Sequence, residues 1–277
     1  MSQQEPATQN GVSLATYEFP TQRLKKVLSD SSRTPLVLVA CGSFSPITYL
    51  HLRIFEMALD WVRYNTEFEV VGGYLSPVGD AYKKAGLASA EHRINMCNLA
   101  VADSSWISVD QWEPLHKEYL PTAKVLDHFD HELNEVRGGI EDYTGQKRKV
   151  RVALLAGADL IQTMSTPSKA WKPVPRSRNE LIGNQTSGPP RIWTTFWATV
   201  SLPNGKVLTS NDCSVIHQLV KNDVSSTRIR LFLKRDMSIR YLVPEGVIKY
   251  IEANRLYSDE GEKKEDNGKV ASASSSS

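Results

Sequence analysis

Cysteine is scarce in this sequence, and its three residues, Cys41, Cys97 and Cys213, form no Cys-x-x-Cys pair. An odd, scattered set argues against a disulfide framework and suits a reducing compartment. We therefore expect residence in the nucleus, the cytoplasm or both. The basic run Lys147–Arg151 is compatible with a nuclear signal or nucleic-acid patch, and equally with solvated charge on a loop.

Long apolar runs and a strong excess of one charge are also missing. No stretch of about 18 apolar residues occurs, so we expect no membrane span and no membrane partner. The first residues, MSQQEPATQNG, lack the apolar stretch of a signal peptide. With 33 basic and 31 acidic residues the net charge is +2, which does not suggest a nucleic-acid binder.

The 277 residues, 40% hydrophobic and 23% charged, instead suit a globular protein with one large core. We expect one domain over residues 34–257, after a disordered or loosely ordered segment at 1–33. The Ser-rich, charged tail at 258–277 cannot bury enough apolar surface to become ordered. Inside the domain, residues 168–214 show no sustained period and are predicted to be irregular.

Apolar runs that read as strands alternate with segments of helical spacing. The predicted strands are 36–41, 69–75, 107–110 and 150–156. The predicted helices are 48–64, 89–102, 121–136, a short one near Asp159, 226–234 and 244–254. This alternation predicts an α/β fold, in which a parallel sheet is covered by helices on both faces.

The turn after the first strand, Gly42–His51, has the features of a phosphate site. Glycine lets backbone approach a ligand closely, and the start of a helix offers free N–H groups to phosphate. Thr48 and His51 are three residues apart, hence on one face of the helix. A lone turn of this kind is more often only a capped helix start.

A second candidate site, Ser225–Arg230, immediately precedes or opens a helix. It combines hydroxyl groups, the cations Arg228 and Arg230, and a helix N-terminus, all of which attract phosphate. Taken alone, the segment favours a simpler interpretation, a capped helix that carries a solvated basic face.

Together these sites resemble eukaryotic nicotinamide/nicotinate mononucleotide adenylyltransferases, of the nucleotidylyltransferase superfamily. That family carries GSFxPxTxxHLR near its start and ISSTKIR near its end, which stand here at Gly42–Arg53 and Val224–Arg230. Further matches are the loop SPVGDAYKKAGL, the motif SWISVDQWE, the segment LAGADL, and the ending YIEANRLY. The resemblance implies a Rossmann-like nucleotidyltransferase fold and adenylyl transfer from ATP to the mononucleotide, which gives NAD and pyrophosphate.

The resemblance also implies roles for the matching residues. Catalysis would fall to His51, Arg228 and Arg230. ATP and its phosphates would contact Gly42, Ser43, Phe44, Thr48, His51, Asn222, Ser225, Ser226, Thr227, Arg228, Ile229 and Arg230. The mononucleotide would contact Tyr82, Lys84, Tyr119, Thr122, Gly157 and Asp159. Tyr119 stands where the family often has Trp, but a tyrosine ring can still stack.

Mg²⁺ is the expected cofactor, held mainly by ATP phosphates, since no metal cage of protein ligands alone is evident. His128 and His131 are spaced for a metal pair, but a solvated helix face is the simpler interpretation. The expected partners are the two nucleotides, and self-association stays open. Rival enzymes are the cytidylyltransferases and pantetheine-phosphate adenylyltransferases of the superfamily, which lack the substrate loop.

Residues 168–214 depart from the family pattern. The family continues with STPxxW, an acidic helix with a pattern like DLDHILG, and a strand ending in Glu-Arg, whereas here helix and strand are unrecognisable. The codons of residues 191–198, read from the last base of the Arg191 codon, are compatible with Asp-Leu-Asp-His-Ile-Leu-Gly. Its second Asp, its second Leu and its Gly are forced by the codons of the two tryptophans, Trp193 and Trp197, and their neighbours.

We therefore hypothesise that residues 168 to about 214 reflect retained introns and a shifted frame in a gene model, or an aberrant splice form. A lineage-specific insertion is the alternative. We expect this stretch to be poorly ordered, to leave a gap in the sheet and to weaken activity. A catalytically impaired homologue, acting only as a nucleotide-binding or chaperone-like module, is the alternative function.

Overall fold

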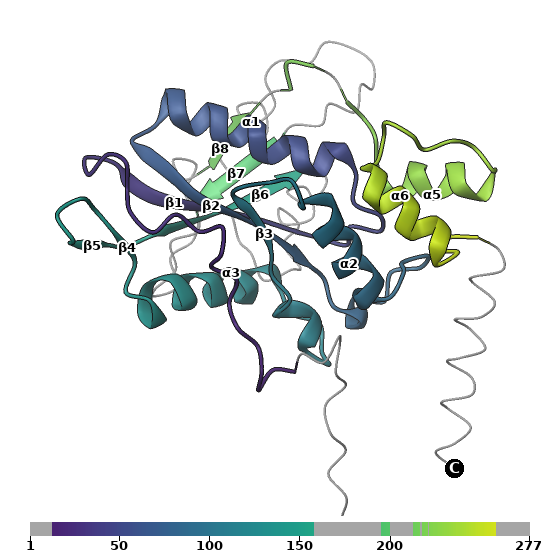
Figure 1. The fold of residues 1–277 in the computed structure, drawn as a ribbon, viewed down its shortest axis with the longest axis horizontal. Helices are drawn as coiled ribbons and strands as arrows, with labels where there is room; N and C mark the ends of the chain where they lie inside the picture. The colour runs from purple at the N-terminus through teal and green to yellow at the C-terminus, as the bar shows by residue number, and fades with distance from the viewer. Residues whose placement is uncertain (1–12, 158–194, 200–212, 217, 221, 259–277) are drawn as a thin grey trace, which may run out of the picture.

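A six-stranded sheet forms the centre of the computed structural model, which describes residues 13–157, 195–199, 213–216, 218–220 and 222–258 (Figure 1). The strand order is β3-β2-β1-β6-β7-β8. The strands are β1 Thr34–Gly42, β2 Phe68–Pro77, β3 Ile107–Val109, β6 Arg151–Gly157, β7 Thr195–Thr199 and β8 Cys213–Ile216. A separate two-stranded hairpin joins β4 Ile140–Glu141 to β5 Lys147–Arg148.

The first four strands of this order pair in parallel, as the sequence predicts. The next two, β7 and β8, pair antiparallel, so the sheet as a whole is mixed. The expected gap in the sheet is wrong, because β7 lies within residues 168–214 and joins β6 to β8. Its sequence, TFWAT, is rich in the β-branched and aromatic residues that favour strands. Residues 168–194 and 200–212 lie outside the described part of the chain.

The helices begin and end close to their predicted limits. They are α1 Tyr49–Asn65, α2 Ala90–Ala100, α3 Thr122–Asp130, α5 Ser226–Lys234 and α6 Glu245–Ala253. The predicted helix 121–136 is divided, because α3 continues into a π-helical turn at His131–Val136. The helix predicted near Asp159 falls outside the described residues. Among the helices that are described, none has the length and apolarity to cross a membrane.

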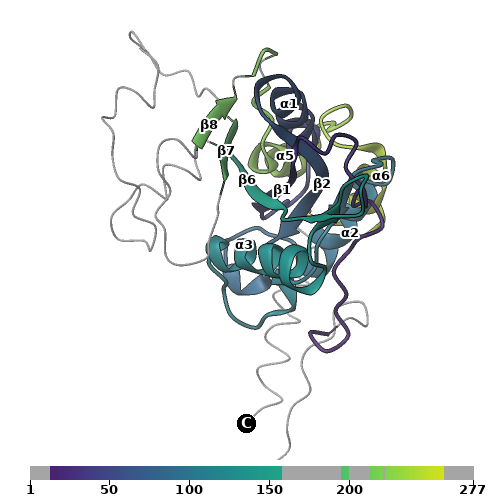
Figure 2. The ribbon, with the colours of Figure 1, turned by 90° about the vertical axis from the view of Figure 1, so that its left-hand side faces the viewer.

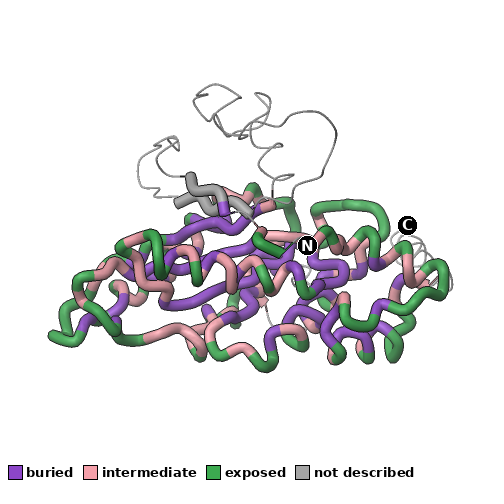
Figure 3. Tube along the Cα trace, turned by 90° about the horizontal axis from the view of Figure 1, so that it is seen from above, coloured by how far each residue is buried: buried purple, intermediate pink, exposed green. Residues whose placement is uncertain are grey.

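The two faces of the sheet are covered by different helices (Figures 1 and 2). Alternation along β1 sends Leu36 and Leu38 into the core beneath α1, α2, α5 and α6. Val37 and Val39 point to the other face, where they join the α3 residues in a second core. Figure 3 shows the buried residues, in purple, concentrated in the interior of the domain, with exposed residues in green at its outer turns. Burying each such side chain stabilises the fold by about 1.5–3 kcal/mol, an upper estimate.

Residues 13–33 pack against the domain and are not the loose segment expected there. Phe19 and Leu28 are 5% and 3% exposed and belong to the α3-side core. The guanidinium of Arg23 donates to the carbonyls of Val101 and Ile107, at 2.7 and 2.5 Å. Phe19 and Leu28 are too far apart in sequence to predict a helix or a strand, yet their burial holds the segment against the domain.

Candidate active site

The carboxyl ends of the parallel strands bring the predicted residues to one edge of the sheet. Gly42 ends β1, Pro77 ends β2, and Gly157 ends β6. In open α/β sheets ligands bind at this edge, at the point where the connections that follow two neighbouring strands leave in opposite directions. The edge is therefore the place to look for a nucleotide site.

The turn after β1 is tightly built. Phe44 adopts a left-handed backbone, with φ of 44°, and its side chain is buried. A Cβ on Gly42 would lie 3.1 Å from the Phe44 ring, so glycine fits here better than any larger residue. Phe44 thus serves the turn as packing, and only its backbone is suited to contact a nucleotide.

Thr48 caps α1 and holds His51 in one orientation. The Thr48 N–H donates to His51 Nδ1 at 3.0 Å, and the Thr48 hydroxyl lies 2.8 Å from the same nitrogen. The imidazole also meets the edge of the Phe44 ring, with 5.3 Å between centroids. Since Nδ1 accepts the backbone hydrogen bond, the neutral imidazole carries its proton on Nε2.

The N-terminus of α5 lies against this turn, although the two segments are far apart in sequence. The Ser226 hydroxyl donates to the carbonyl of Pro46 at 2.8 Å, across 180 residues. Arg230 Nη1 donates to the carbonyl of Ser45 at 2.7 Å. Ser225 caps α5, its hydroxyl accepting the Arg228 N–H at 3.3 Å. The two predicted phosphate sites are thus neighbours.

The surroundings of two residues of α5, Arg228 and Ile229, differ from those that their expected roles require. Arg228 is half-exposed and forms an ion pair with Asp223, which places its charge on the preceding turn. The Ile229 side chain is fully buried, and its N–H already donates to the Ser225 carbonyl at 3.0 Å. Ile229 is therefore a core residue, and a contact with ATP from its side chain is excluded by this geometry.

Asn222 and Thr227 support the approach to α5. The Asn222 side-chain oxygen accepts the Val224 N–H at 3.0 Å, shaping the turn before the helix. The exposed Thr227 hydroxyl receives a long hydrogen bond, 3.4 Å, from Arg230. Burial lowers the pKa of Arg230 from its ordinary value, but a guanidinium stays charged at physiological pH.

Two of the residues predicted to bind the mononucleotide, Tyr82 and Tyr119, contact each other. The rings of Tyr82 and Tyr119 stack at 5.8 Å, and they are 41% and 53% exposed. Lys84 is exposed on the same loop as Tyr82, and Thr122 opens α3 just after Tyr119. Stacked, half-exposed rings suit the binding of a flat heterocycle. Of the two remaining predicted residues, Gly157 ends β6 and Asp159 lies outside the described residues.

A buried acidic layer lies beneath this surface. The Ser76 hydroxyl donates to Glu113 Oε2 at 3.3 Å, and burial raises the Glu113 pKa to about 8. Asp110 is fully buried and accepts the Tyr17 hydroxyl at 2.5 Å, and burial raises its pKa to about 7. The sequence contains both carboxyl groups in one motif, but only packing reveals their burial.

His128 does not lie on a solvated helix face as expected. Its side chain is 7% exposed and stacks on the Trp112 ring, with 4.0 Å between centroids. Burial lowers its pKa to about 3, so the ring is neutral. His131, three residues on, is exposed. The described residues contain no cluster of three or more potential metal ligands.

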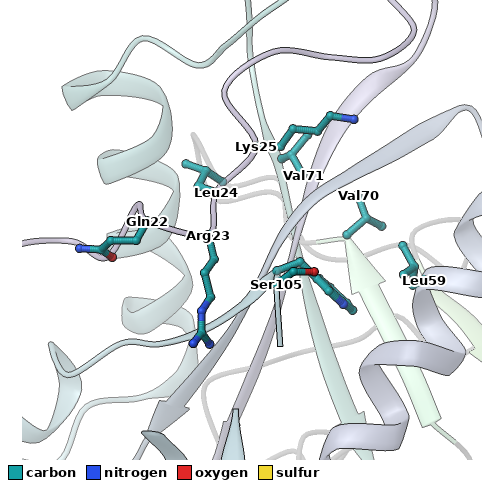
Figure 4. Close-up of a pocket in the computed structure, with 9 residues that line it drawn as sticks. Gln22, Arg23, Leu24, Lys25, Leu59, Val70, Val71 and Ser105 are labelled. Carbon is teal, nitrogen blue, oxygen red and sulfur yellow. The ribbon is translucent and has the colours of Figure 1, made fainter. Parts of the chain in front are cut away.

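A separate hollow of about 430 Å³ lies away from this edge (Figure 4). It is lined by Leu59 of α1, Val70 near the start of β2, and the backbone segment that carries Leu24. Arg23 and Lys25, the cations there, already bind carbonyls and Glu69. Its position at the amino end of β2 separates it from the candidate site.

Comparison with known proteins decides the family. A family model described as cytidylyltransferase-like matches residues 39–232. Nicotinamide/nicotinic acid mononucleotide adenylyltransferase of Schizosaccharomyces pombe is 48% identical over 254 residues, covering 91% of this chain and 68% of that protein. The chain belongs to this adenylyltransferase family. The adenylyltransferase 1 of Bos taurus is 36% identical over 271 residues, covering 86% of this chain and 94% of its own.

The family assignment confirms the resemblance and the Rossmann-like nucleotidyltransferase fold. Adenylyltransferase 1 of Saccharomyces cerevisiae is also 48% identical, over 257 residues and 90% of this chain, and the chain spans 62% of its length. Among solved structures, Plasmodium falciparum nicotinic acid mononucleotide adenylyltransferase complexed with NaAD aligns at 18% identity and a TM-score of 0.47. That alignment covers 80% of this chain and 97% of the other.

Proposed function

We propose that this chain transfers the adenylyl group of ATP to nicotinamide mononucleotide, and to nicotinate mononucleotide. An oxygen of the mononucleotide phosphate attacks the α-phosphorus of ATP, and the bond to the bridging oxygen of pyrophosphate breaks. The products are the dinucleotide and pyrophosphate. The attacking phosphate is already ionised, so the reaction needs positioning and charge neutralisation more than a proton acceptor.

The observation that carries the proposal is the contact between the Gly42–His51 turn and the start of α5. Ser226 and Arg230 reach across to the carbonyls of Pro46 and Ser45. This contact joins a turn that begins at Gly42, two helix N-termini and a cation at one edge of the sheet. Each of these features attracts phosphate by itself, and together they suit a triphosphate.

His51 is suited to donate a hydrogen bond to the phosphate being transferred. Its Nδ1 accepts the Thr48 N–H, so its Nε2 carries the ring proton. A donor fixed in this way stabilises charge that develops in the transition state, without reorganising during the reaction. Arg230 adds a permanent charge close by. We also propose that Arg228 acts only after leaving Asp223.

The mononucleotide would lie on the Tyr82–Tyr119 side, where the rings can receive its heterocycle. Lys84 and Thr122 flank that side with a cation and a hydroxyl. We propose that Mg²⁺ accompanies the phosphates of ATP, where it would neutralise charge as the pyrophosphate leaves.

A coupled assay tests the proposal. The purified chain is mixed with ATP, Mg²⁺ and either mononucleotide, and both the dinucleotide and pyrophosphate are measured. We expect equal amounts of the two products. CTP in place of ATP, and pantetheine phosphate in place of the mononucleotide, test the rival enzymes. Turnover with one of these and none with the mononucleotides would assign the chain to that rival instead. Binding of both nucleotides without any turnover would instead support the impaired homologue that acts as a binding module.

A further inference from the structure

Arg93, in the first turn of α2, is a fully buried cation close to the candidate site. Its guanidinium makes three hydrogen bonds in three directions. Nε donates to the Ala88 carbonyl at 2.9 Å, Nη1 to the Ser43 carbonyl at 3.2 Å, and Nη2 to Asp80 Oδ1 at 3.2 Å. A buried guanidinium is tolerated only when its donors are satisfied in this way.

These acceptors belong to two different substrate-binding segments. Ser43 lies in the turn Gly42–His51, which we call the phosphate turn. Asp80 and Ala88 lie at the two ends of the loop that carries Tyr82 and Lys84. The loop is tied further, since Asp80 Oδ1 accepts the Ala90 N–H at 2.7 Å and Ser45 Oγ accepts the Ala88 N–H at 3.0 Å. Only residues 81–87 project between the two anchored ends.

We propose that Arg93 is a positioning residue that sets the loop of residues 80–88 against the phosphate turn, and so aligns the mononucleotide with ATP. The inference rests on the proposed function for its substrates, but its structural part concerns this chain alone. Arg93 acts through Asp80 and Ser43 and touches neither nucleotide. The planar guanidinium is required, because a lysine ammonium cannot direct donors to all three acceptors at once.

The Ser43 contact also orients the turn. In a trans peptide unit the carbonyl and the following N–H point in opposite directions. Because Arg93 binds the Ser43 carbonyl, the Phe44 N–H faces away from α2. Arg93 thereby fixes the direction of one backbone donor in the turn as well as the ends of the loop.

Two substitutions test this role, with a matched control. Asp80→Asn keeps the side-chain oxygen but removes the charge that pairs with Arg93, and Arg93→Lys removes the planar group. Glu245→Gln is the control, because Glu245 is also an exposed carboxylate in an ion pair, at 52% exposure against 57% for Asp80. Asp80→Asn changes a half-exposed side chain and keeps the test usable if Arg93→Lys folds poorly.

Amide hydrogen exchange provides a readout that does not need activity. We expect Asp80→Asn to speed exchange in residues 80–88 about tenfold, with the melting temperature and the exchange of β1 and β6 nearly unchanged. Unchanged exchange in the loop, or faster exchange throughout the chain, would overturn the proposal. Hydrogen exchange can be measured even if the wild-type chain makes no dinucleotide. A failure of the proposed function therefore appears in the coupled assay alone, and a failure of the positioning role appears in the exchange.

Steady-state kinetics provide the second readout. In Asp80→Asn we expect the KM for the mononucleotide to rise about tenfold while the KM for ATP changes less than twofold. Arg93→Lys also releases the Ser43 carbonyl, so it should raise both KM values and lower kcat about tenfold, since the two substrates are less well aligned. Equal changes in both KM values in Asp80→Asn would show a general structural role and contradict the inference.

Discussion

At the scale of single residues, His51 owes its orientation to backbone chemistry. The Thr48 N–H and the Phe44 ring edge fix the imidazole from two sides. We predict that His51→Ala lowers kcat by about 10²–10³-fold, with a smaller change in KM, because it removes a donor to the transition state. Rapid-quench single-turnover kinetics measure the chemical step. His131→Ala, a change of an exposed histidine on another helix, should leave the rate unchanged.

The two arginines of α5 differ in their surroundings and therefore in their expected contributions. Arg230 donates to the Ser45 carbonyl, whereas Arg228 pairs with Asp223 at the surface. We predict that Arg230→Ala lowers kcat/KM at least tenfold more than Arg228→Ala does. The comparison is made at saturating mononucleotide with ATP varied. Equal losses would contradict this ranking and show that Arg228, once it has left Asp223, contributes as much as Arg230.

Sequence patterns predicted the chemistry of individual residues better than they predicted which residues those would contact. The proximity of His51 to Thr48 follows from helical spacing, and the stacking of Tyr82 on Tyr119 joins two motifs placed by family resemblance. The central role of Ser45 had no such signal. Its hydroxyl meets Ala88 and Tyr257, and these contacts depend on tertiary packing that no local pattern encodes.

At the scale of elements, the limits of the helices followed from periodicity and capping. The helix α5 begins and ends where the sequence predicted, because Ser225 is a strong N-cap and the apolar face is regular. β7 was not predicted, because residues 168–214 as a whole show no sustained period, although TFWAT itself favours a strand and Pro203-Asn204-Gly205 follows as a turn signal.

The cap of α5 contributes to stability as well as to the site. We predict that Ser225→Ala lowers the free energy of unfolding by about 1 kcal/mol, because the Arg228 N–H loses its acceptor. Urea titration should show a lower midpoint with an unchanged m-value. Ser31→Ala, whose side chain caps no helix, is the control and should shift the midpoint much less.

At the scale of the whole molecule, burial of Glu113 makes stability depend on pH. Burial raises its pKa from 4.5 to about 8, so the folded protein keeps a proton that the unfolded chain has lost in that interval. The stabilising contribution of this proton is complete below pH 4.5 and is lost progressively as the pH rises to about 8.

We predict that Glu113→Gln removes this part of the pH dependence. The free energy of unfolding of the variant, relative to wild type, should rise between pH 5 and pH 8, by at most about 1.4 kcal/mol per pH unit. Denaturant titrations at a series of pH values give the difference. A difference that stays constant over this range would show that Glu113 is already ionised in the folded protein.

Residues 168–214 bear on the activity of the whole chain. We predict that transcripts covering this stretch contain intron boundaries or a second reading frame, in which the codons of residues 191–198 specify an acidic helix. Sequencing the message across the region decides the matter. A single continuous frame in every transcript would support a lineage-specific insertion that the enzyme accommodates.

The hydrogen bond between Ser45 and Tyr257 spans 212 residues, at 2.8 Å. On the ribosome, the phosphate turn is therefore synthesised long before the tyrosine that closes over it. At roughly 5–20 residues per second, the delay is on the order of 10–40 s. Arg230 is also synthesised late, so the site on the nascent chain stays incomplete until residues 230 and 257 have been made. Nucleotide can stabilise the complete site only after that point.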